Sequence, residues 1–491
     1  MGMMFSYHLG ALGRLVFKST KYFIKEGEKL MQHFDFIVCG SGPAGQKAAI
    51  QAAKLGKKVA IVDKKKDIGG ICLHTGTIPS KTLREIVLYL SGYNQRGFYG
   101  QSYRLKDDLT MNDLTQRLHT TLQREAEVIL HQLHRNNVKV FDGLASFEDD
   151  KKIQVTDPKG KQIHLSADYF LIATGTHPHR PEDYPFDDKQ VIDSDSLLDL
   201  NHLPRSMTVI GAGVIGVEYA SIFSAMDVQV NLIDGRDQLL GFMDKELTDH
   251  LIHQLRDHGM TIRMGEQVAS IEKQSDGSIL TRLQSGKQLT TETVLVAAGR
   301  SGNTATLALE NASVDVNKRQ LIEVNDNYQS SQPHIYAAGD VIGFPSLAST
   351  SMEQGRQVAC HAFGKTIANK MENFPFGIYS VPEMSMVGMT EEQLTRDKIP
   401  YEIGIARLRE TARGQIMGLE HGMLKLIFSL DTQQLLGVHI IGEGATELIH
   451  IGQAALVLNG GLNYFLENIF NYPTLAEAYK IAALDAWNRI N

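Results

Sequence analysis

The feature that most constrains the fold of this chain is a pattern that occurs twice. In the first copy a short apolar run, 34–39, leads into Gly40, Gly42 and Gly45, which have the spacing G-x-G-x-x-G. An alanine-bearing helical stretch follows, and a second apolar run, 59–63, ends in an acid. Short apolar runs separated by a helical segment predict two parallel β-strands joined by a helix.

The second copy repeats this order. The run 207–210 leads into Gly211, Gly213 and Gly216, and after a helical stretch the run 228–234 also ends in an acid. Such glycines allow a tight turn and let backbone N–H groups approach a pyrophosphate at the helix N-terminus. Glycine spacing alone is a weak signal, but strand, turn, helix and an acid about twenty residues further on are a specific one. The sequence therefore predicts two bound dinucleotides.

Composition limits the remaining choices. A chain of 491 residues is too long for one hydrophobic core, and its length suggests about three domains. A net charge of −7 argues against a nucleic-acid binder, which usually has a basic stripe. The three cysteines, Cys39, Cys72 and Cys360, are too few for a zinc cage or a secreted disulfide framework. A reducing, cytoplasmic location is therefore predicted.

The first thirty residues have two interpretations. They mix apolar residues with Arg14, Lys18, Lys21 and other basic residues, which is typical of a targeting or membrane-surface helix. The simpler interpretation, which we favour, is a disordered extension over 1–32. No apolar run approaches the roughly 18 residues needed to span a bilayer, so no integral membrane segment is predicted.

Three further apolar runs end in glycine turns. They predict strands that end at Gly175, at Gly299 and at Gly339, the last followed by Asp340. From about residue 374 the pattern changes to alternating strands and two helical segments, 443–458 and 475–489, which predict an α+β domain.

The segment 69–81, with the sequence GGICLHTGTIPSK, completes a resemblance. With the motifs above, in this order across 33–491, the chain resembles the two-dinucleotide flavoproteins that include dihydrolipoamide dehydrogenase and glutathione reductase. In that family two cysteines in this segment carry electrons from the flavin to a disulfide substrate. Here only Cys72 is present and Thr77 occupies the second position. Together with Tyr472 in the stretch 470–474, this resembles the soluble pyridine nucleotide transhydrogenases within the family.

The resemblance implies a fold and two sets of binding residues. The fold is α/β, with two Rossmann-like FAD and NAD(P) domains and an α+β C-terminal dimerisation domain. FAD, NAD and NADP are the implied cofactors. The implied FAD-binding residues are Gly40, Gly42, Gly45, Asp63, Gly69, Gly70, Cys72, Gly175, Gly339 and Asp340. The implied NAD(P)-binding residues are Gly211, Gly213, Gly216, Asp234, Arg236 and Gly299.

The resemblance also implies catalytic residues and domain boundaries. Lys81 is expected near flavin N5, paired with Glu218, where a cation stabilises the electron-rich reduced flavin. The expected domains are the first part of the FAD domain (33–150), the NAD(P) domain (151–295), the second part of the FAD domain (296–365) and the dimerisation domain (370–491). A homodimer or higher homo-oligomer is expected, in which the C-terminal segment of one subunit completes the active site of the other.

Two departures from the disulfide reductases agree with each other. Those enzymes carry a histidine directly before a proline near the C-terminus, which exchanges a proton with the thiol. Here Tyr472 precedes Pro473, whereas Glu477 is retained. A phenol is a poor proton carrier at neutral pH. Loss of the second sulfur at Thr77 together with the proton carrier predicts loss of the disulfide half-reaction.

The remaining chemistry is ping-pong hydride transfer between NADPH and NAD⁺, in either direction, through FAD. Asp234 favours a ribose 2′-hydroxyl and Arg236 suits a 2′-phosphate, so the pair suggests a compromise between the two nucleotides. The alternative is that Asp234 makes the site NAD-selective and Arg236 faces water. Cys72 is expected to act mainly as a small apolar residue, with a redox role left open.

Three other functions stay open at this stage. The first is a lipoamide-type disulfide reductase that pairs Cys72 with a distant cysteine. The second is a flavin-binding redox sensor that has lost catalysis, against which the retained Lys81, Glu218 and second dinucleotide unit argue. The third is a diaphorase that passes electrons to quinones or oxygen.

Overall fold

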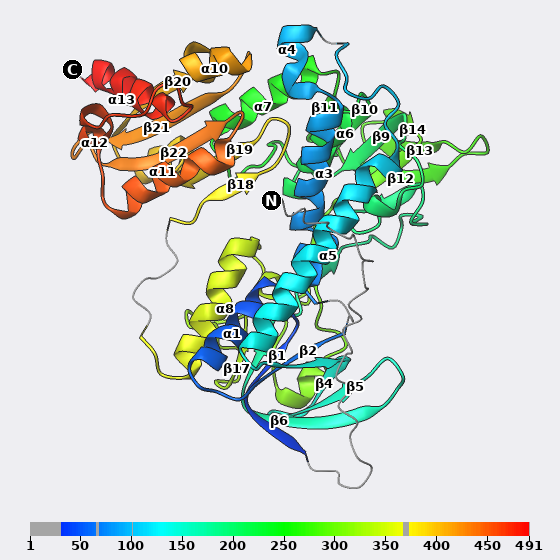
Figure 1. The fold of residues 1–491 in the computed structure, drawn as a ribbon. Helices are drawn as coiled ribbons and strands as arrows, with labels where there is room; N and C mark the ends of the chain where they lie inside the picture. Colours follow the sequence, from blue (N-terminus) through cyan, green and yellow to red (C-terminus); the bar gives the residue numbers. More distant parts are fainter. Residues whose placement is uncertain (1–30, 65–67, 101, 367–372, 491) are drawn as a thin grey trace, which may run out of the picture.

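The computed structural model describes residues 31–64, 68–100, 102–366 and 373–490. They form two α/β units and a C-terminal α+β unit, which lie at the bottom, upper right and upper left of Figure 1. The main sheet of the second unit is parallel, and that of the first unit is parallel except at one edge, where the last two strands pair antiparallel. The predicted fold class is therefore confirmed. The predicted N-terminal extension lies outside the described residues as far as residue 30.

The first unit contains the first glycine turn. Its sheet has the order β3-β2-β1-β6-β5-β4, and β17 pairs with the C-terminal end of β6. Residues 36–39, the second half of β1, are an uninterrupted apolar run because they are buried on both faces of the sheet. The strands are β1 (Gln32–Cys39), β2 (Val59–Asp63), β3 (Lys139–Asp142), β4 (Leu144–Asp149), β5 (Lys152–Thr156), β6 (Gln162–Ile172) and β17 (Ile335–Ala337).

Helices from distant parts of the sequence cover this sheet. The first helix begins at Pro43, where the missing N–H of proline costs nothing, and it packs closely against α8. A β-carbon at Gly355 of α8 would lie 2.0 Å from the carbonyl oxygen of Ala44, so only glycine allows this approach. These helices are α1 (Pro43–Lys54), α5 (Met111–Arg135) and α8 (Ala348–Ala362). The segment after β2 forms α2 (Gly70–His74), α3 (Thr77–Leu90) and α4 (Arg96–Tyr99), of which α3 packs against the second unit and α4 lies at the top of Figure 1.

The second unit contains the second glycine turn. Its parallel sheet has the order β11-β10-β9-β15-β8, and an antiparallel sheet β12-β13-β14 adjoins it. Its elements are β8 (Val191–Asp193), β9 (Ser206–Ile210), α6 (Val214–Ser224), β10 (Gln229–Asp234), α7 (Lys245–Asp257), β11 (Thr261–Met264), β12 (Val268–Lys273), β13 (Ile279–Leu283), β14 (Gln288–Thr291) and β15 (Thr293–Val296). The chain enters and leaves this unit through a two-stranded ribbon of β7 (Thr176–Pro178) and β16 (Arg300–Gly302).

The C-terminal unit is an antiparallel sheet with the order β18-β19-β22-β21-β20. One face, with Leu424, Leu426 and Val438, packs against the C-terminal helices, and the other, with Met423 and Ile441, packs against the second unit. Its elements are β18 (Phe376–Ile378), β19 (Met384–Gly388), α9 (Glu391–Asp397), β20 (Tyr401–Arg407), α10 (Ala412–Met417), β21 (Met423–Ser429), β22 (Leu435–Ile441), α11 (Ala445–Val457), α12 (Leu462–Glu467) and α13 (Glu477–Ile490).

Strand pairing differs from the predicted division at residue 151. Strands β5 and β6, which span residues 152–172, continue the first sheet through pairing of β6 with β1. β6 pairs with β5 along its first half and with β17 at its end, and all three strands belong to the first sheet. The chain therefore leaves the first sheet only after residue 172. The boundaries of the other domains stay predictions.

Short 3₁₀ helices lie at Tyr93–Gln95, Leu197–Asp199, Leu309–Ala312, Asp340–Ile342 and Leu408–Glu410. Across the part of the chain that the structure describes, no helix combines the length and apolar character needed to cross a membrane.

Candidate active site

A large cavity lies where the two parallel sheets and the C-terminal unit meet. Its volume is about 1630 Å³, which exceeds the range of roughly 300–1,000 Å³ typical of a site for one small ligand. Both glycine turns line it at the carboxyl ends of β1 and β9, the edge at which open α/β sheets bind ligands. Residues 374–377 and Tyr379, which lie in and next to the first strand of the C-terminal sheet, form part of the wall.

The first glycine turn has the geometry that its sequence predicts. Gly40 has a φ of +107°, and a β-carbon there would lie 2.3 Å from the carbonyl oxygen of Ala173. A β-carbon at Gly45 would lie 2.0 Å from the carbonyl oxygen of Gly40, so this glycine lets the helix approach the turn. Gly42 has nothing within 4 Å of its β-carbon position and faces the cavity.

Neighbouring residues hold this turn in place. The Asp63 carboxylate accepts hydrogen bonds from the backbone N–H of Ser41 at 2.7 Å and from its hydroxyl at 2.6 Å. Gly69 donates its N–H to the same hydroxyl oxygen at 3.0 Å, and a β-carbon at Gly70 would lie 2.8 Å from Cα of Gly42. The segment that begins at Gly69 therefore lies directly against the first glycine turn.

Three other predicted residues of the first site line the same cavity: Gly175, Gly339 and Asp340. Asp340 begins the 3₁₀ helix after β17, and its burial raises the pKa of the carboxyl above the usual range, which the charge of Arg300 partly offsets. Asp340 is half-buried and lines the cavity, so its carboxyl can bind a polar group of a ligand there.

The second glycine turn repeats the first. Gly211 has a φ of +107°, and a β-carbon there would lie 2.4 Å from the carbonyl oxygen of Ala297. A β-carbon at Gly216 would lie 1.8 Å from the carbonyl oxygen of Gly211. Gly213 is open except for Arg236, whose Nη2 lies 3.9 Å from its β-carbon position, and Gly299 also lines the cavity.

Asp234 and Arg236 form a two-point ion pair at one end of the second site. The guanidinium donates from Nη2 at 2.6 Å and from Nε at 2.9 Å, and Asp234 also accepts the N–H of Ala212 at 2.6 Å. Burial raises the pKa of Asp234, but the hydrogen bonds from Arg236 and Ala212 lower it overall. The Arg236 side chain is 60% exposed, so it can leave the carboxylate for a ligand phosphate without crossing the protein interior.

Lys81 and Glu218 meet inside the cavity, as the resemblance implies. The ammonium of Lys81, on α3, lies 2.6 Å and 2.7 Å from the two carboxylate oxygens of Glu218, on α6. Tyr379, which follows β18, donates its N–H to Glu218 at 2.9 Å, and its ring centroid lies 4.8 Å from the ammonium. Elements of all three units therefore position one cation. No motif surrounds Tyr379, so its contact with Glu218 is not predictable from the sequence.

Cys72 and Thr77 lie together where the disulfide reductases have two sulfurs. Cys72 belongs to α2 and Thr77 is the first residue of α3, and their side chains are hydrogen-bonded. Burial raises the pKa of the Cys72 thiol, which the hydrogen bond from Thr77 partly offsets. Cys39, Cys72 and Cys360 are all free thiols.

Comparison with known proteins identifies the family. The family model for pyridine nucleotide-disulphide oxidoreductases matches residues 34–355, and the model for the dimerisation domain of the same family matches residues 374–483. The chain belongs to the pyridine nucleotide-disulphide oxidoreductases. Its C-terminal unit is the dimerisation domain of this family, which supports the expected homodimer.

Curated relatives cover nearly the whole chain. The chain is 52% identical over 461 residues to the soluble pyridine nucleotide transhydrogenase of Mycobacterium tuberculosis, covering 94% of this chain and 98% of the relative. It is 44% identical over 462 residues to the soluble pyridine nucleotide transhydrogenase of Escherichia coli, covering 93% and 98%.

Solved structures of the family share the fold. The HOCl-induced flavoprotein disulfide reductase RclA from Escherichia coli is 26% identical, with a TM-score of 0.82 over 92% of this chain and 99% of that one. LpdA from Mycobacterium tuberculosis is 23% identical, with a TM-score of 0.84 over the same shares, a likeness that shows the fold alone.

The cavity fits the two dinucleotides that this family of oxidoreductases binds, FAD and NAD(P). Two glycine turns with matching geometry face one volume, and each is held by the acid at the end of the following strand, Asp63 or Asp234. A β-carbon at Gly40 or Gly211 would strike backbone atoms, so both turns depend on glycine.

The residues near the C-terminus lie away from the cavity of their own chain. Tyr472 is 68% exposed, and neither it nor Glu477 lines the cavity. One carboxylate oxygen of Glu477 is buried and has no hydrogen-bond partner within the described residues. Glu477 occupies the position of the glutamate that follows the proton-carrying histidine in the disulfide reductases. In this chain Tyr472 occupies the position of that histidine. Its approach to the active site of the partner subunit stays a prediction.

Sequence reasoning also missed an aromatic cluster at the cavity wall. Ring centroids of Phe242, Phe344 and Phe374 lie 5.1, 5.9 and 5.3 Å from that of Phe376. Phe242 and Phe344 are distant in the sequence from Phe374 and Phe376 and join them only in the fold, so no sequence motif marks the cluster.

The raised pKa of Cys72 predicts slow alkylation at neutral pH. Only the thiolate reacts, and its fraction falls roughly tenfold for each unit by which the pKa is raised. With iodoacetamide, mass mapping of Cys72 should give a rate that is low at pH 7 and still rises above pH 9. A rate at pH 7 equal to that of a free peptide thiol would contradict the buried, protonated state.

Proposed function

We propose that this oxidoreductase is a FAD-dependent pyridine nucleotide transhydrogenase, which transfers reducing equivalents between NADPH and NAD⁺ in both directions. One observation carries the proposal: Thr77, at the start of α3, lines the cavity with Cys72 of α2 at the position where a disulfide reductase needs a second sulfur. A hydroxyl cannot form a disulfide, so electrons have no thiol route out of the site. The relatives named soluble pyridine nucleotide transhydrogenase support the same activity.

Each predicted site residue has a role in this proposal. Bound FAD supplies a carrier that takes two electrons from one nicotinamide nucleotide and passes them to a second one. Lys81 and Glu218 are the proposed catalytic residues. The proposed FAD-binding residues are Gly40, Gly42, Gly45, Asp63, Gly69, Gly70, Cys72, Gly175, Gly339 and Asp340. The proposed NAD(P)-binding residues are Gly211, Gly213, Gly216, Asp234, Arg236 and Gly299.

The chain contributes charge and position to the reaction. Glu218 and the ring of Tyr379 hold the Lys81 ammonium in one place, so its positive charge is preorganised where negative charge develops. The side chain of Glu218 is only 5% exposed, and low local polarity strengthens this charge interaction. The two glycine turns bring both dinucleotides into one cavity, which fixes the distance between the reacting groups.

We place the reaction in the cytoplasm. The three free cysteines suit a reducing compartment, and the relatives carry the word soluble in their names.

A steady-state assay tests the proposed function. With NADPH and the thio analogue of NAD⁺, the purified flavoprotein should give parallel double-reciprocal lines, the pattern of a ping-pong reaction. Lipoamide and oxidised glutathione should be reduced at negligible rates. Disulfide reduction at a rate comparable with transhydrogenation would instead support a lipoamide-type reductase.

Replacing Arg236 with alanine is expected to shift the balance between the two nucleotides. If Arg236 turns from Asp234 to the 2′-phosphate, its loss removes a charged hydrogen bond worth about 1.5–3 kcal/mol, or at least about tenfold in KM for NADPH. The KM for NADH should change much less. Arg236→Lys keeps the charge, so its KM for NADPH should lie between that of the unaltered protein and that of Arg236→Ala. Equal changes in both KM values would contradict the assignment.

A further inference from the structure

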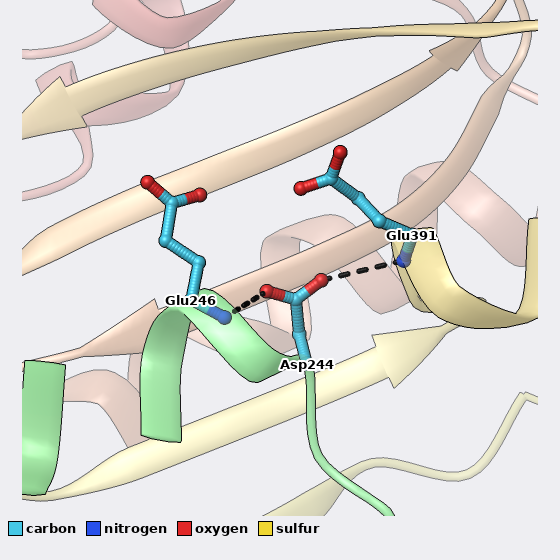
Figure 2. Close-up of side chains that lie close together, drawn as sticks. All are labelled: Asp244, Glu246 and Glu391. Atoms are coloured by element: carbon cyan, nitrogen blue, oxygen red, sulfur yellow. Dashed lines mark hydrogen bonds between the residues drawn. The ribbon is translucent and has the colours of Figure 1, made fainter. Parts of the chain in front are cut away.

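A lysine lies completely buried between the dimerisation domain and the second dinucleotide domain. Lys425, in the middle of β21, is 0% exposed. Its ammonium lies 2.9 Å from Asp244 and 3.0 Å from Glu246, and it also contacts the carboxylate of Glu391. The three carboxylates converge on one point from α9 and from the start of α7 (Figure 2).

The cluster is apolar on the side of the sheet and open to solvent on the other side, where Glu246 and Glu391 are partly exposed. The same face of the sheet carries Met386 and Met423, which pack into one core with Leu247 of α7. His439 is the cross-strand neighbour of Lys425, and burial lowers the pKa of its imidazole, so it remains neutral near pH 7. The ammonium of Lys425 is therefore a buried positive charge shared by the three carboxylates, and its removal would leave the buried carboxylate of Asp244 without its cation, which is strongly destabilising.

Asp244 connects the cluster to the nucleotide site. It accepts the N–H of Glu246 at 3.2 Å and thereby caps α7, and it accepts the N–H of Glu391 at 3.3 Å. The loop 235–243, which ends at Asp244, places Arg236 and Phe242 in the cavity wall. Within this loop the N–H of Leu240 donates to the carbonyl oxygen of Ala212 in the second glycine turn at 3.4 Å.

We infer that Lys425 is a positioning residue for the nicotinamide nucleotide. Its ammonium binds Asp244 and thereby holds the loop 235–243 against the dimerisation domain. The loop is held at one end by β10 and at the other by Asp244. Lys425 acts on bound nucleotide through Asp244 and has no contact with the cavity itself.

The geometry of the carboxylates makes this cation replaceable. One oxygen from each of Asp244, Glu246 and Glu391 lies within 4.8 Å of the others, a spacing that could hold a metal ion. Carboxylate oxygens are the ligands that Mn²⁺ and Ca²⁺ prefer. A serine at position 425 leaves room for an ion and adds a hydroxyl oxygen, whereas a methionine fills the space and adds no suitable ligand.

The test compares two variants, Lys425→Ser and Lys425→Met, with Mn²⁺ as the probe. Equilibrium dissociation constants of the oxidised protein for NADP⁺ and NAD⁺, which cannot reduce the flavin, should rise at least about fivefold in both variants, the lower end of typical coupling between sites. The kcat should change by less than the dissociation constants do. Mn²⁺ should restore nucleotide affinity in Lys425→Ser alone, and electron paramagnetic resonance should detect Mn²⁺ bound to that variant.

Two controls separate this role from a general loss of stability. Lys245→Met removes an exposed ion pair with Asp249 on the same helix and should leave nucleotide affinity unchanged. The double variant Asp244→Asn with Lys425→Met keeps the local charge balance, so it should fold even where Lys425→Ser does not. Nucleotide affinity should still fall in the double variant, because the anchor is lost.

Unchanged dissociation constants in Lys425→Met and in the double variant would overturn the inference. Equal rescue by Mn²⁺ in the serine and methionine variants would also overturn it. The inference rests on the proposed function for its nucleotide ligands, but binding is measured without turnover. Absence of transhydrogenation in the unaltered protein would therefore count against the proposed function, and unchanged binding in the variants would count against Lys425.

Discussion

Lys81→Met is expected to lower the kcat of electron transfer from NADPH to NAD⁺ by about a hundredfold or more, the effect typical of losing one preorganised stabilising group. The variant also leaves the buried carboxylate of Glu218 with the N–H of Tyr379 as its one remaining hydrogen-bond partner among the residues that the structure describes. Because one charged partner is lost, the free energy of unfolding should fall by about 1–3 kcal/mol. Stopped-flow absorbance of the bound flavin and thermal unfolding measure the two effects separately.

The matched control for this variant is Glu218→Gln. Glutamine keeps an acceptor for the N–H of Tyr379 but loses the charge that holds the ammonium of Lys81. Its kcat should fall less than that of Lys81→Met, while both variants retain flavin, since neither side chain belongs to the glycine turns. A kcat within threefold of the unaltered protein in Lys81→Met would show that Lys81 is not a catalytic residue.

The second large effect is expected from Thr77→Cys. Because the side chain of Thr77 is hydrogen-bonded to the thiol of Cys72, the new sulfur should lie close enough to form a disulfide. Anaerobic titration with NADPH should then consume two equivalents per flavin, since the disulfide takes a second pair of electrons. Transhydrogenation should slow because electrons rest on the dithiol, and Thr77→Ser should behave like the unaltered protein.

Disulfide substrates should still react poorly with Thr77→Cys. Tyr472 stands where the disulfide reductases have the histidine that exchanges protons with the thiol. If Thr77→Cys alone reduced lipoamide rapidly, the tyrosine would not be the second missing part of the disulfide half-reaction.

The local parts of this fold could be predicted from the sequence, and the distant contacts could not. The two glycine turns are encoded in short segments, because positive φ at Gly40 and Gly211 and the close approach at Gly45 and Gly216 each require glycine. In contrast, the pairing of Lys81 with Glu218 joins residues on separate helices. It was expected only because the chain resembles a known family.

Other features depend on how whole units pack. The run 162–172 is recognisable as a strand, but its pairing with β1 and β17 decides which sheet it joins, and the predicted boundary at 151 differs for that reason. In the sequence, Lys425 lies between Leu424 and Leu426, an alternation of apolar and polar residues that is typical of a strand with one solvent-exposed face. Its burial and its three carboxylate partners appear only once β21 lies against α7 and α9.

Anaerobic titration of the unaltered protein tests the central claim most directly. NADPH should reduce the protein with uptake of no more than one two-electron equivalent per flavin, and excess NAD⁺ should restore the oxidised spectrum with formation of NADH. Alkylation under denaturing conditions should find Cys39, Cys72 and Cys360 as free thiols both before and after reduction. Uptake of a second equivalent, with new thiols appearing on reduction, would contradict the account.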